Sequence, residues 1–197
     1  MPSSSEHPGL LVVLSGPSGV GKTTIMKAIR DRFDAVFSVS ATTRAATANE
    51  VDGVDYMFLA QDDFQQMVDD DAFLEFAQVF GKDWYGTPLA PIERALASGT
   101  MVILDIDVQG ALQVRNKRAD AFMMFILPPS EEELLRRLRA RGRDDEDAIL
   151  RRFDEAKREI ATARSSEGYD AFIVNDDLHR AIAATGDAIE ARLSQTA

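Results

Sequence analysis

Residues 10–24 read Leu-Leu-Val-Val-Leu-Ser-Gly-Pro-Ser-Gly-Val-Gly-Lys-Thr-Thr, and this stretch decides the fold. Its first five residues are all apolar, which is typical of a short strand buried on both faces. Residues 16–23 then match the pattern Gly-x-x-x-x-Gly-Lys-Thr, and a helical apolar pattern begins at Ile25. A glycine loop between a strand and a helix is the setting in which this pattern binds phosphate. The alternative is an accidental glycine- and serine-rich turn, and the flanking strand and helix argue against it.

The chemistry of the loop indicates a nucleoside triphosphate. Backbone N–H groups in such a loop surround phosphate oxygens, and the helix N-terminus adds a partial positive charge. Lys22 can reach the β- and γ-phosphates, and the hydroxyl of Thr23 can ligate Mg²⁺. The predicted triphosphate-binding residues are Gly16, Pro17, Ser18, Gly19, Val20, Gly21, Lys22, Thr23 and Thr24.

Length and composition exclude several classes of function. The chain has 197 residues, of which 45% are hydrophobic, and this fits one domain with a proper core. It contains no cysteine, so disulfides, thiolate catalysis and cysteine-based zinc sites are excluded, which suits a cytoplasmic protein. There is no run of 18 apolar residues, so we expect no membrane span, and residues 1–9 read as a disordered tail. A net charge of −11 disfavours nucleic acid and anionic membranes as partners.

Strands and helices alternate along most of the chain, and the predicted strands include residues 36–40 and 169–174. This order predicts an α/β fold, a parallel sheet of the P-loop type with helices on both faces. Residues 41–90 instead contain short β segments and are predicted to form a small β-rich lobe. Residues 130–164 contain two helices and are predicted to form a lid. The predicted core comprises residues 10–40, 91–129 and 165–197.

Two aspartates follow the apolar strand predicted at residues 101–105. Asp105 ends this strand, where a carboxylate can hold Mg²⁺ directly or through water. Asp107 precedes a helix, and either aspartate could instead cap that helix. We favour a metal or substrate role for Asp105 and the capping role for Asp107.

Seven arginines between residues 136 and 152 form a basic cluster in an acidic chain. Helical spacing places Arg137 and Arg141 at the edge of a leucine stripe, and Arg152 on the inward side of the next helix. Closed over a triphosphate, these three guanidinium groups would neutralise charge on the transferred phosphoryl group. The alternative is a helical hairpin with ordinary ion pairs, such as Glu133 with Arg137. We favour the catalytic role for these three and the ordinary role for Arg136, Arg139, Arg143 and Arg151.

From about Leu10 to Leu178 the chain resembles the guanylate kinase family, which transfers phosphate from ATP to GMP in purine nucleotide metabolism. Each matching segment alone is weak evidence for the family, but the occurrence of all of them in this order is highly specific. The pieces are residues 15–24, 38–44 (Ser-Val-Ser-Ala-Thr-Thr-Arg), 53–58 (Gly-Val-Asp-Tyr-Met-Phe), 73–77 (Phe-Leu-Glu-Phe-Ala), 84–87 (Trp-Tyr-Gly-Thr), 103–110 (Ile-Leu-Asp-Ile-Asp-Val-Gln-Gly) and 173–178 (Ile-Val-Asn-Asp-Asp-Leu).

The resemblance implies a GMP site in the predicted lobe. Ser40, Glu75, Thr87 and Asp105 match positions at or near the guanine, Arg44, Tyr56 and Tyr85 match those that hold the GMP phosphate, and Asn175 matches a position near the adenine of ATP. The chemistry agrees, because one carboxylate such as Glu75 can accept both the N1–H and the N2–H of guanine, and adenine offers no such donor pair. A core role for the tyrosines and a capping role for Asn175 are the alternatives.

The sequence departs from the family at one informative position. Where the family usually has a second phosphate-binding arginine, this chain has Thr47. Losing one charge-assisted hydrogen bond to phosphate costs about 1.5–3 kcal/mol, which is about 10- to 150-fold in affinity. We therefore expect weaker GMP binding with the reaction unchanged. A non-catalytic binding module and a kinase of another small phosphate (dGMP or a sugar phosphate) remain alternatives.

Overall fold

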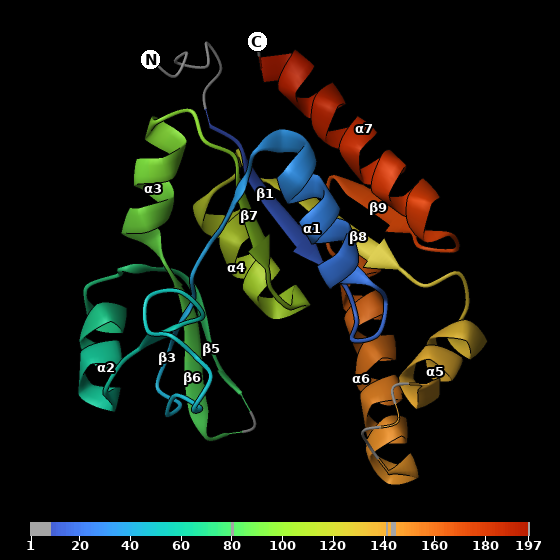
Figure 1. Ribbon diagram of the computed structural model, residues 1–197, viewed down its shortest axis with the longest axis horizontal. Helices are drawn as coiled ribbons and strands as arrows, with labels where there is room; N and C mark the ends of the chain where they lie inside the picture. The colour runs from blue at the N-terminus through green and yellow to red at the C-terminus, as the bar shows by residue number, and fades with distance from the viewer. Residues whose placement is uncertain (1–8, 80, 141, 143–144, 197) are drawn as a thin grey trace.

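The computed structural model describes residues 9–79, 81–140, 142 and 145–196 of the chain. A five-stranded sheet forms its centre (Figure 1), with the strand order β2-β7-β1-β8-β9 and every neighbouring pair parallel. The elements are β1 (Leu11–Ser15), α1 (Lys22–Phe33), β2 (Val36–Phe37), β3 (Ala41–Thr42), β4 (Met57–Phe58), α2 (Gln61–Asp69), β5 (Phe73–Val79), β6 (Asp83–Pro88), α3 (Leu89–Ala97), β7 (Val102–Asp105), α4 (Val108–Lys117), β8 (Phe122–Leu127), α5 (Glu131–Ala140), α6 (Glu146–Ser165), β9 (Ala171–Val174) and α7 (Leu178–Thr196).

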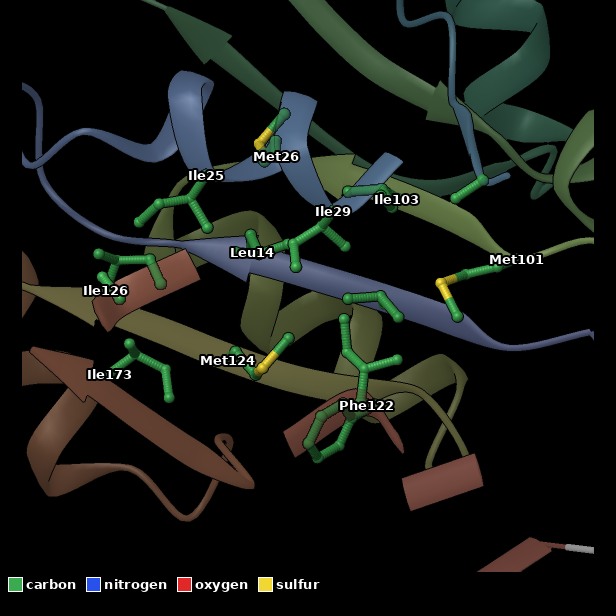
Figure 2. Packing of buried hydrophobic residues seen from close by; sticks show 14 of the residues in the cluster. Leu14, Ile25, Met26, Ile29, Met101, Ile103, Phe122, Met124, Ile126 and Ile173 are labelled. Carbon is green, nitrogen blue, oxygen red and sulfur yellow. The ribbon is translucent and has the colours of Figure 1, made fainter. Parts of the chain in front are cut away.

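The central strand β1 is buried along its whole length, as its apolar sequence predicts. Its side chains alternate between the two faces of the sheet, so Val12 and Leu14 pack under α1 and α7, whereas Leu11 and Val13 pack under α3 and α4. Figure 2 shows the first of these layers, with Leu14 among residues from α1 and the neighbouring strands. Helices on both faces confirm the predicted fold class, and the carboxyl end of β1 leads directly into the glycine loop.

A second sheet has four short strands in the order β4-β3-β6-β5. Its strands come from residues 41–88, within the segment predicted to be β-rich, and its pairs are antiparallel except for β3 with β4. An aromatic cluster fills its inner side, where the rings of Phe64 and Phe73 stack at 4.4 Å. This sheet contacts the large one through α4, because the side chain of Gln113 bonds both the N–H and the C=O of Phe76, at 3.2 and 3.0 Å.

Helices α5 and α6 form the predicted hairpin, and they pack through Leu134, Leu138, Ile149 and Ala156. The hydroxyl of Ser130 accepts the backbone N–H of Glu133 at 3.2 Å, which is one half of a capping box. The carboxylate of Glu133 bonds Arg136 and Arg137 on its own helix. Arg141, Arg143 and Asp144 lie outside the described residues, so the predicted catalytic role of Arg141 stays a prediction.

Sequence patterns misplaced the ends of two strands. The predicted strand at 36–40 is only Val36–Phe37, and the predicted strand at 169–174 begins at Ala171. The predicted tail covers residues 1–9; residues 1–8 lie outside the described part, and Gly9 donates its N–H to Leu96 O at 3.2 Å. Among the helices that the structure describes, none is both long enough and apolar enough to cross a membrane.

Asp107 caps α4, as we favoured from the sequence. Its Oδ1 accepts the backbone N–H of Gly110 at 2.8 Å. Asp107→Ala should therefore lower the free energy of unfolding by about 1 kcal/mol, because an N–H of the first turn loses its partner. Urea denaturation measures this, with Asp145→Ala, the equivalent cap of α6, as the matched control. A loss near zero for Asp107→Ala alone would show that its hydrogen bond does not hold the helix.

Candidate active site

The glycine loop joins β1 to α1 and is braced from the far end of the sheet. The side-chain amide of Asn175, which follows β9, donates to Val20 O at 2.7 Å and is only 5% exposed. Gly21 has a φ of 101°, and a Cβ there would lie 2.5 Å from Asn175 Nδ2. Glycine is therefore required at this point of the loop, both for its backbone conformation and for space. Asn175 was predicted to lie near the adenine of ATP, and the structure places it beneath the loop.

Lys22 lies between the loop and the end of β7. Its ammonium group donates to Gly16 O and lies 3.9 Å from Asp105 Oδ1. Desolvation raises the pKa of Asp105, and the charge of Lys22 opposes this effect. Lys22 is predicted to contact the ATP phosphates, and Asp105 is predicted to contact the metal or GMP. The fold brings these two side chains together, although they are far apart in the sequence.

Two of the three predicted lid arginines are described, and both reach the loop region. Arg152 on α6 donates from Nη2 to Ser18 Oγ at 2.9 Å, which places this guanidinium against the phosphate-binding loop. Arg137 on α5 donates from Nη2 to Asn175 O at 3.0 Å and from Nε to Glu133 Oε1 at 2.7 Å. The Glu133–Arg137 ion pair, which we set aside in the sequence analysis, is therefore present. It coexists with the inward position of Arg137, because a guanidinium group carries five N–H donors.

A cavity of about 210 Å³ opens between the two sheets. Four residues of the predicted GMP site line it, namely Ser40, Tyr56, Thr87 and Asp105, together with the unpredicted Ser38 and Asp55. Because Asp105 also neighbours Lys22, the cavity lies beside the glycine loop. The carboxyl ends of parallel strands are where such folds bind their ligands.

Glu75 lies behind this cavity and is 7% exposed. It accepts a hydrogen bond from the hydroxyl of Thr87, and burial raises its pKa. A Cβ at Gly110 would lie 2.9 Å from Glu75 Oε2, so α4 approaches this carboxylate closely. A buried carboxylate with spare acceptor capacity is suited to a partner that presents two N–H donors side by side.

Arg44, Tyr56 and Tyr85 form the predicted phosphate clamp, and the structure brings them together. Arg44 Nε donates to Tyr85 Oη at 3.2 Å, and its guanidinium lies over the Tyr56 ring at 5.4 Å. The Tyr85 hydroxyl accepts from Arg44, so its own proton is available to an incoming phosphate oxygen. Desolvation is the main cause that raises the pKa of Tyr56.

Besides Ser38 and Asp55, sequence reasoning missed two polar residues that hold the site residues in place. Glu50 forms a bidentate ion pair with Arg44, at 2.7 and 3.0 Å. Gln113 fixes β5 and hence Glu75. Glu50 lies six residues after Arg44 in a segment without periodicity, and Gln113 acts across 37 residues. A carboxylate close to Arg44 in sequence was the only signal available for the first, and the second had none.

Glu159 on α6 is a partly buried acid near Lys22. Burial raises its pKa to about 7, with Lys22 opposing this and Asp107 and Glu155 adding to it. The native state therefore holds a proton on Glu159 that the unfolded state has already lost between about pH 4.5 and pH 7. Stability from this group is present at low pH and is lost as the pH rises through 7.

Replacing Glu159 by Gln should therefore raise the free energy of unfolding at pH 8, by about 1–2 kcal/mol after allowance for partial solvent exposure, and should change it little at pH 4.5. Urea denaturation at both pH values measures the difference. Glu167→Gln is the control, because it removes the same charge at an exposed position just after this helix and Glu167 is not among the groups that shift the pKa of Glu159. An equal effect of Glu159→Gln at both pH values would contradict the raised pKa.

The polar groups near the loop fit a metal ion that arrives with its nucleotide. Among the described residues, no cluster of three or more His, Cys, Asp or Glu side chains could hold a metal ion without help. Mg²⁺ keeps several waters and is bound by one or two protein ligands together with substrate phosphates. The Thr23 hydroxyl at the start of α1 and the Asp105 carboxylate beside Lys22 are oxygen donors of this kind.

Comparison with known proteins identifies the family of the chain. The sequence model of the family described as Guanylate kinase matches residues 9–192. The chain is 46% identical to a guanylate kinase of Thermosynechococcus vestitus (96% of this chain, 97% of that one) and 48% identical to one of Carboxydothermus hydrogenoformans (89% and 85%). Its structure resembles the crystal structure of guanylate kinase from Anaplasma phagocytophilum, with a TM-score of 0.70 and 31% identity over 95% of this chain and 87% of that one. These matches show that the chain belongs to the guanylate kinase family.

Proposed function

We propose that this chain transfers the γ-phosphoryl group of ATP to GMP, giving ADP and GDP, with the glycine loop holding ATP and the cavity between the sheets holding GMP. One observation carries the proposal: Lys22 Nζ of the loop lies 3.9 Å from Asp105, which lines the cavity. A donor phosphate and an acceptor phosphate bound at these two places would meet beside Lys22. We also propose that the reaction takes place in the cytoplasm, which suits a chain without cysteine.

Catalysis would come from the alignment of the two phosphates and from neutralisation of the charge on the transferred phosphoryl group. The GMP phosphate is already a nucleophile, so no strong general base is needed. Lys22, Arg152 and Arg137 supply positive charge to the transferred group, and Arg141 is predicted to add to them. Mg²⁺, held by Thr23 and Asp105, would supply further charge neutralisation at the ATP phosphates.

Recognition of the acceptor is divided between base and phosphate. Glu75 would accept the N1–H and N2–H of guanine, and Ser40 and Thr87 would line the base pocket. Arg44, Tyr56 and Tyr85 would hold the phosphate. We propose that the segment 41–90 closes over GMP and the hairpin of α5 and α6 over ATP, which would exclude water from the reacting groups.

A bisubstrate compound tests the joint site. Adenosine and guanosine linked through a pentaphosphate bridge should bind at least about 100-fold tighter than GMP in calorimetry, because one molecule fills both sites. The matched compound with two adenosines should bind more weakly, since adenine lacks the donor pair that Glu75 accepts. Equal affinity of the mixed compound and ATP would contradict the proposal and favour a binding module with one nucleotide site.

A further inference from the structure

The guanidinium of Arg44 is nearly saturated by the protein itself. Its Nε donates to Tyr85 at 3.2 Å, its Nη1 to Ala45 O at 2.7 Å and to Glu50 at 3.0 Å, and its Nη2 to Glu50 at 2.7 Å. An arginine has five N–H donors, and these contacts use four of them. A phosphate that enters the clamp therefore meets an arginine whose best bidentate edge already carries a carboxylate.

Glu50 is held in this position from its other side. Its Oε2 accepts both the backbone N–H and the hydroxyl of Thr47, each at 2.8 Å. The hydrogen bonds from Arg44 and Thr47 lower the pKa of Glu50 to about 2, so it stays ionised throughout the neutral range. Thr47 stands where the family resemblance leads one to expect an arginine, and here it holds the carboxylate of Glu50 in place.

The charge at the clamp follows from these contacts. Arg44 and Glu50 form a neutral pair whose side chains are only 27% and 21% exposed, so water screens it weakly. A phosphate dianion gains little from a neutral pair, and it is repelled by a carboxylate that shares its arginine. The clamp is well ordered but electrostatically weak.

From this geometry we propose that Glu50 competes with the acceptor phosphate for Arg44 and so limits the affinity of this chain for GMP. Glu50 acts through Arg44 and is thus a positioning residue. The inference rests on the proposed function, because it takes the acceptor to be GMP. It adds to the expected effect of Thr47: position 47 supplies no positive charge, and Glu50 partly neutralises that of Arg44.

Replacement of Glu50 by Gln removes the negative charge but keeps a side chain of nearly the same size and shape. An amide oxygen in the place of Oε2 can still accept from Thr47 and from Nη1 of Arg44, so most contacts of the loop remain. The negative charge is removed together with the acceptor of Nη2, which leaves that N–H to an incoming phosphate. Asp63→Asn is the matched control, because it makes the same change of net charge on the exposed surface of α2.

Calorimetric titration with GMP, and separately with guanosine, tests the inference. Glu50→Gln should bind GMP about 10-fold tighter than the wild-type chain. Its affinity for guanosine and its KM for ATP should be unchanged. The Asp63→Asn control should bind GMP as tightly as the wild type. If Glu50 has only a structural role, Glu50→Gln should bind both GMP and guanosine more weakly than the wild-type chain. Unchanged or weaker GMP binding by Glu50→Gln overturns the inference alone, whereas a wild-type chain that binds no GMP overturns the proposed function with it.

Thr47→Arg should also lower the KM for GMP, by about 10- to 150-fold, because it adds a charge-assisted hydrogen bond to phosphate and gives Glu50 a second cationic partner besides Arg44. In the Glu50→Gln background the same substitution should have a smaller effect, since the second benefit is gone. Steady-state kinetics of the four proteins in this cycle give the comparison. Two effects that simply multiply would show that Thr47 and Glu50 do not act on one arginine.

Discussion

Lys22→Ala is expected to lower kcat for GMP phosphorylation by about 10³-fold or more. In the structure the ammonium group of Lys22 lies between Gly16 O and Asp105, where it can transfer its hydrogen bonds to the phosphates of ATP. A preorganised donor of this kind typically contributes about 10²–10³-fold to the rate, and a charged group on a transferred phosphoryl contributes about 10³–10⁵-fold. A coupled assay of ADP release under saturating ATP and GMP measures the loss.

The matched control is Lys27→Ala, which removes the same charge from an exposed position of the same helix. We expect wild-type turnover from this variant. Circular dichroism and denaturation of Lys22→Ala should show an intact fold, so that the loss can be assigned to chemistry. Turnover of Lys22→Ala within about threefold of the wild type would remove the basis for placing phosphoryl transfer at this loop.

Glu75→Gln is expected to lower kcat/KM for GMP by about 10³-fold and to remove most of the preference for GMP over IMP. The buried carboxylate can accept from N1–H and N2–H together, whereas a glutamine has one acceptor oxygen and presents an N–H₂ to the second donor. IMP lacks the 2-amino group, so it should lose less. Sites that hydrogen-bond a substrate group reject analogues without it by about 10⁴–10⁵-fold, and this sets the scale of the effect.

Steady-state kinetics with GMP and IMP measure both changes, with Glu93→Gln on the exposed surface of α3 as the control. Because burial raises the pKa of Glu75, the ionised carboxylate is lost at a higher pH than usual for glutamate. The KM for GMP should therefore rise as the pH falls toward mildly acidic values. A GMP:IMP ratio that survives Glu75→Gln would mean that another group reads the 2-amino position.

Local sequence patterns predicted those features in which the burial of a side chain follows from the spacing of apolar residues along the chain. Five consecutive apolar residues predicted a strand buried on both faces, which is β1, and the glycine loop with the apolar pattern after it predicted a helix, which is α1. The inward position of Arg152 also followed from helical spacing, and its contact with Ser18 agrees with it. These features depend on neighbours within one or two turns of chain.

Contacts between distant segments could not be predicted in this way. The ion pair of Glu133 with Arg137 was considered and set aside, because a helical wheel does not show that one guanidinium can face both a helix neighbour and Asn175. The position of Asn175 beneath the loop depends on β9 lying two strands from β1, which is a property of the topology. Glu50 was missed because loop conformation decides which carboxylate reaches Arg44.

The most direct test of the central claim is a screen of acceptors with ATP and Mg²⁺, in which ADP release is followed with GMP, dGMP, AMP, UMP and CMP. A chain that reads guanine through Glu75 and aligns two phosphates beside Lys22 should turn over GMP fastest, accept dGMP, and leave AMP, UMP and CMP at least about 10³-fold behind in kcat/KM. Fast turnover of AMP, or no turnover of any of the five, would contradict the account.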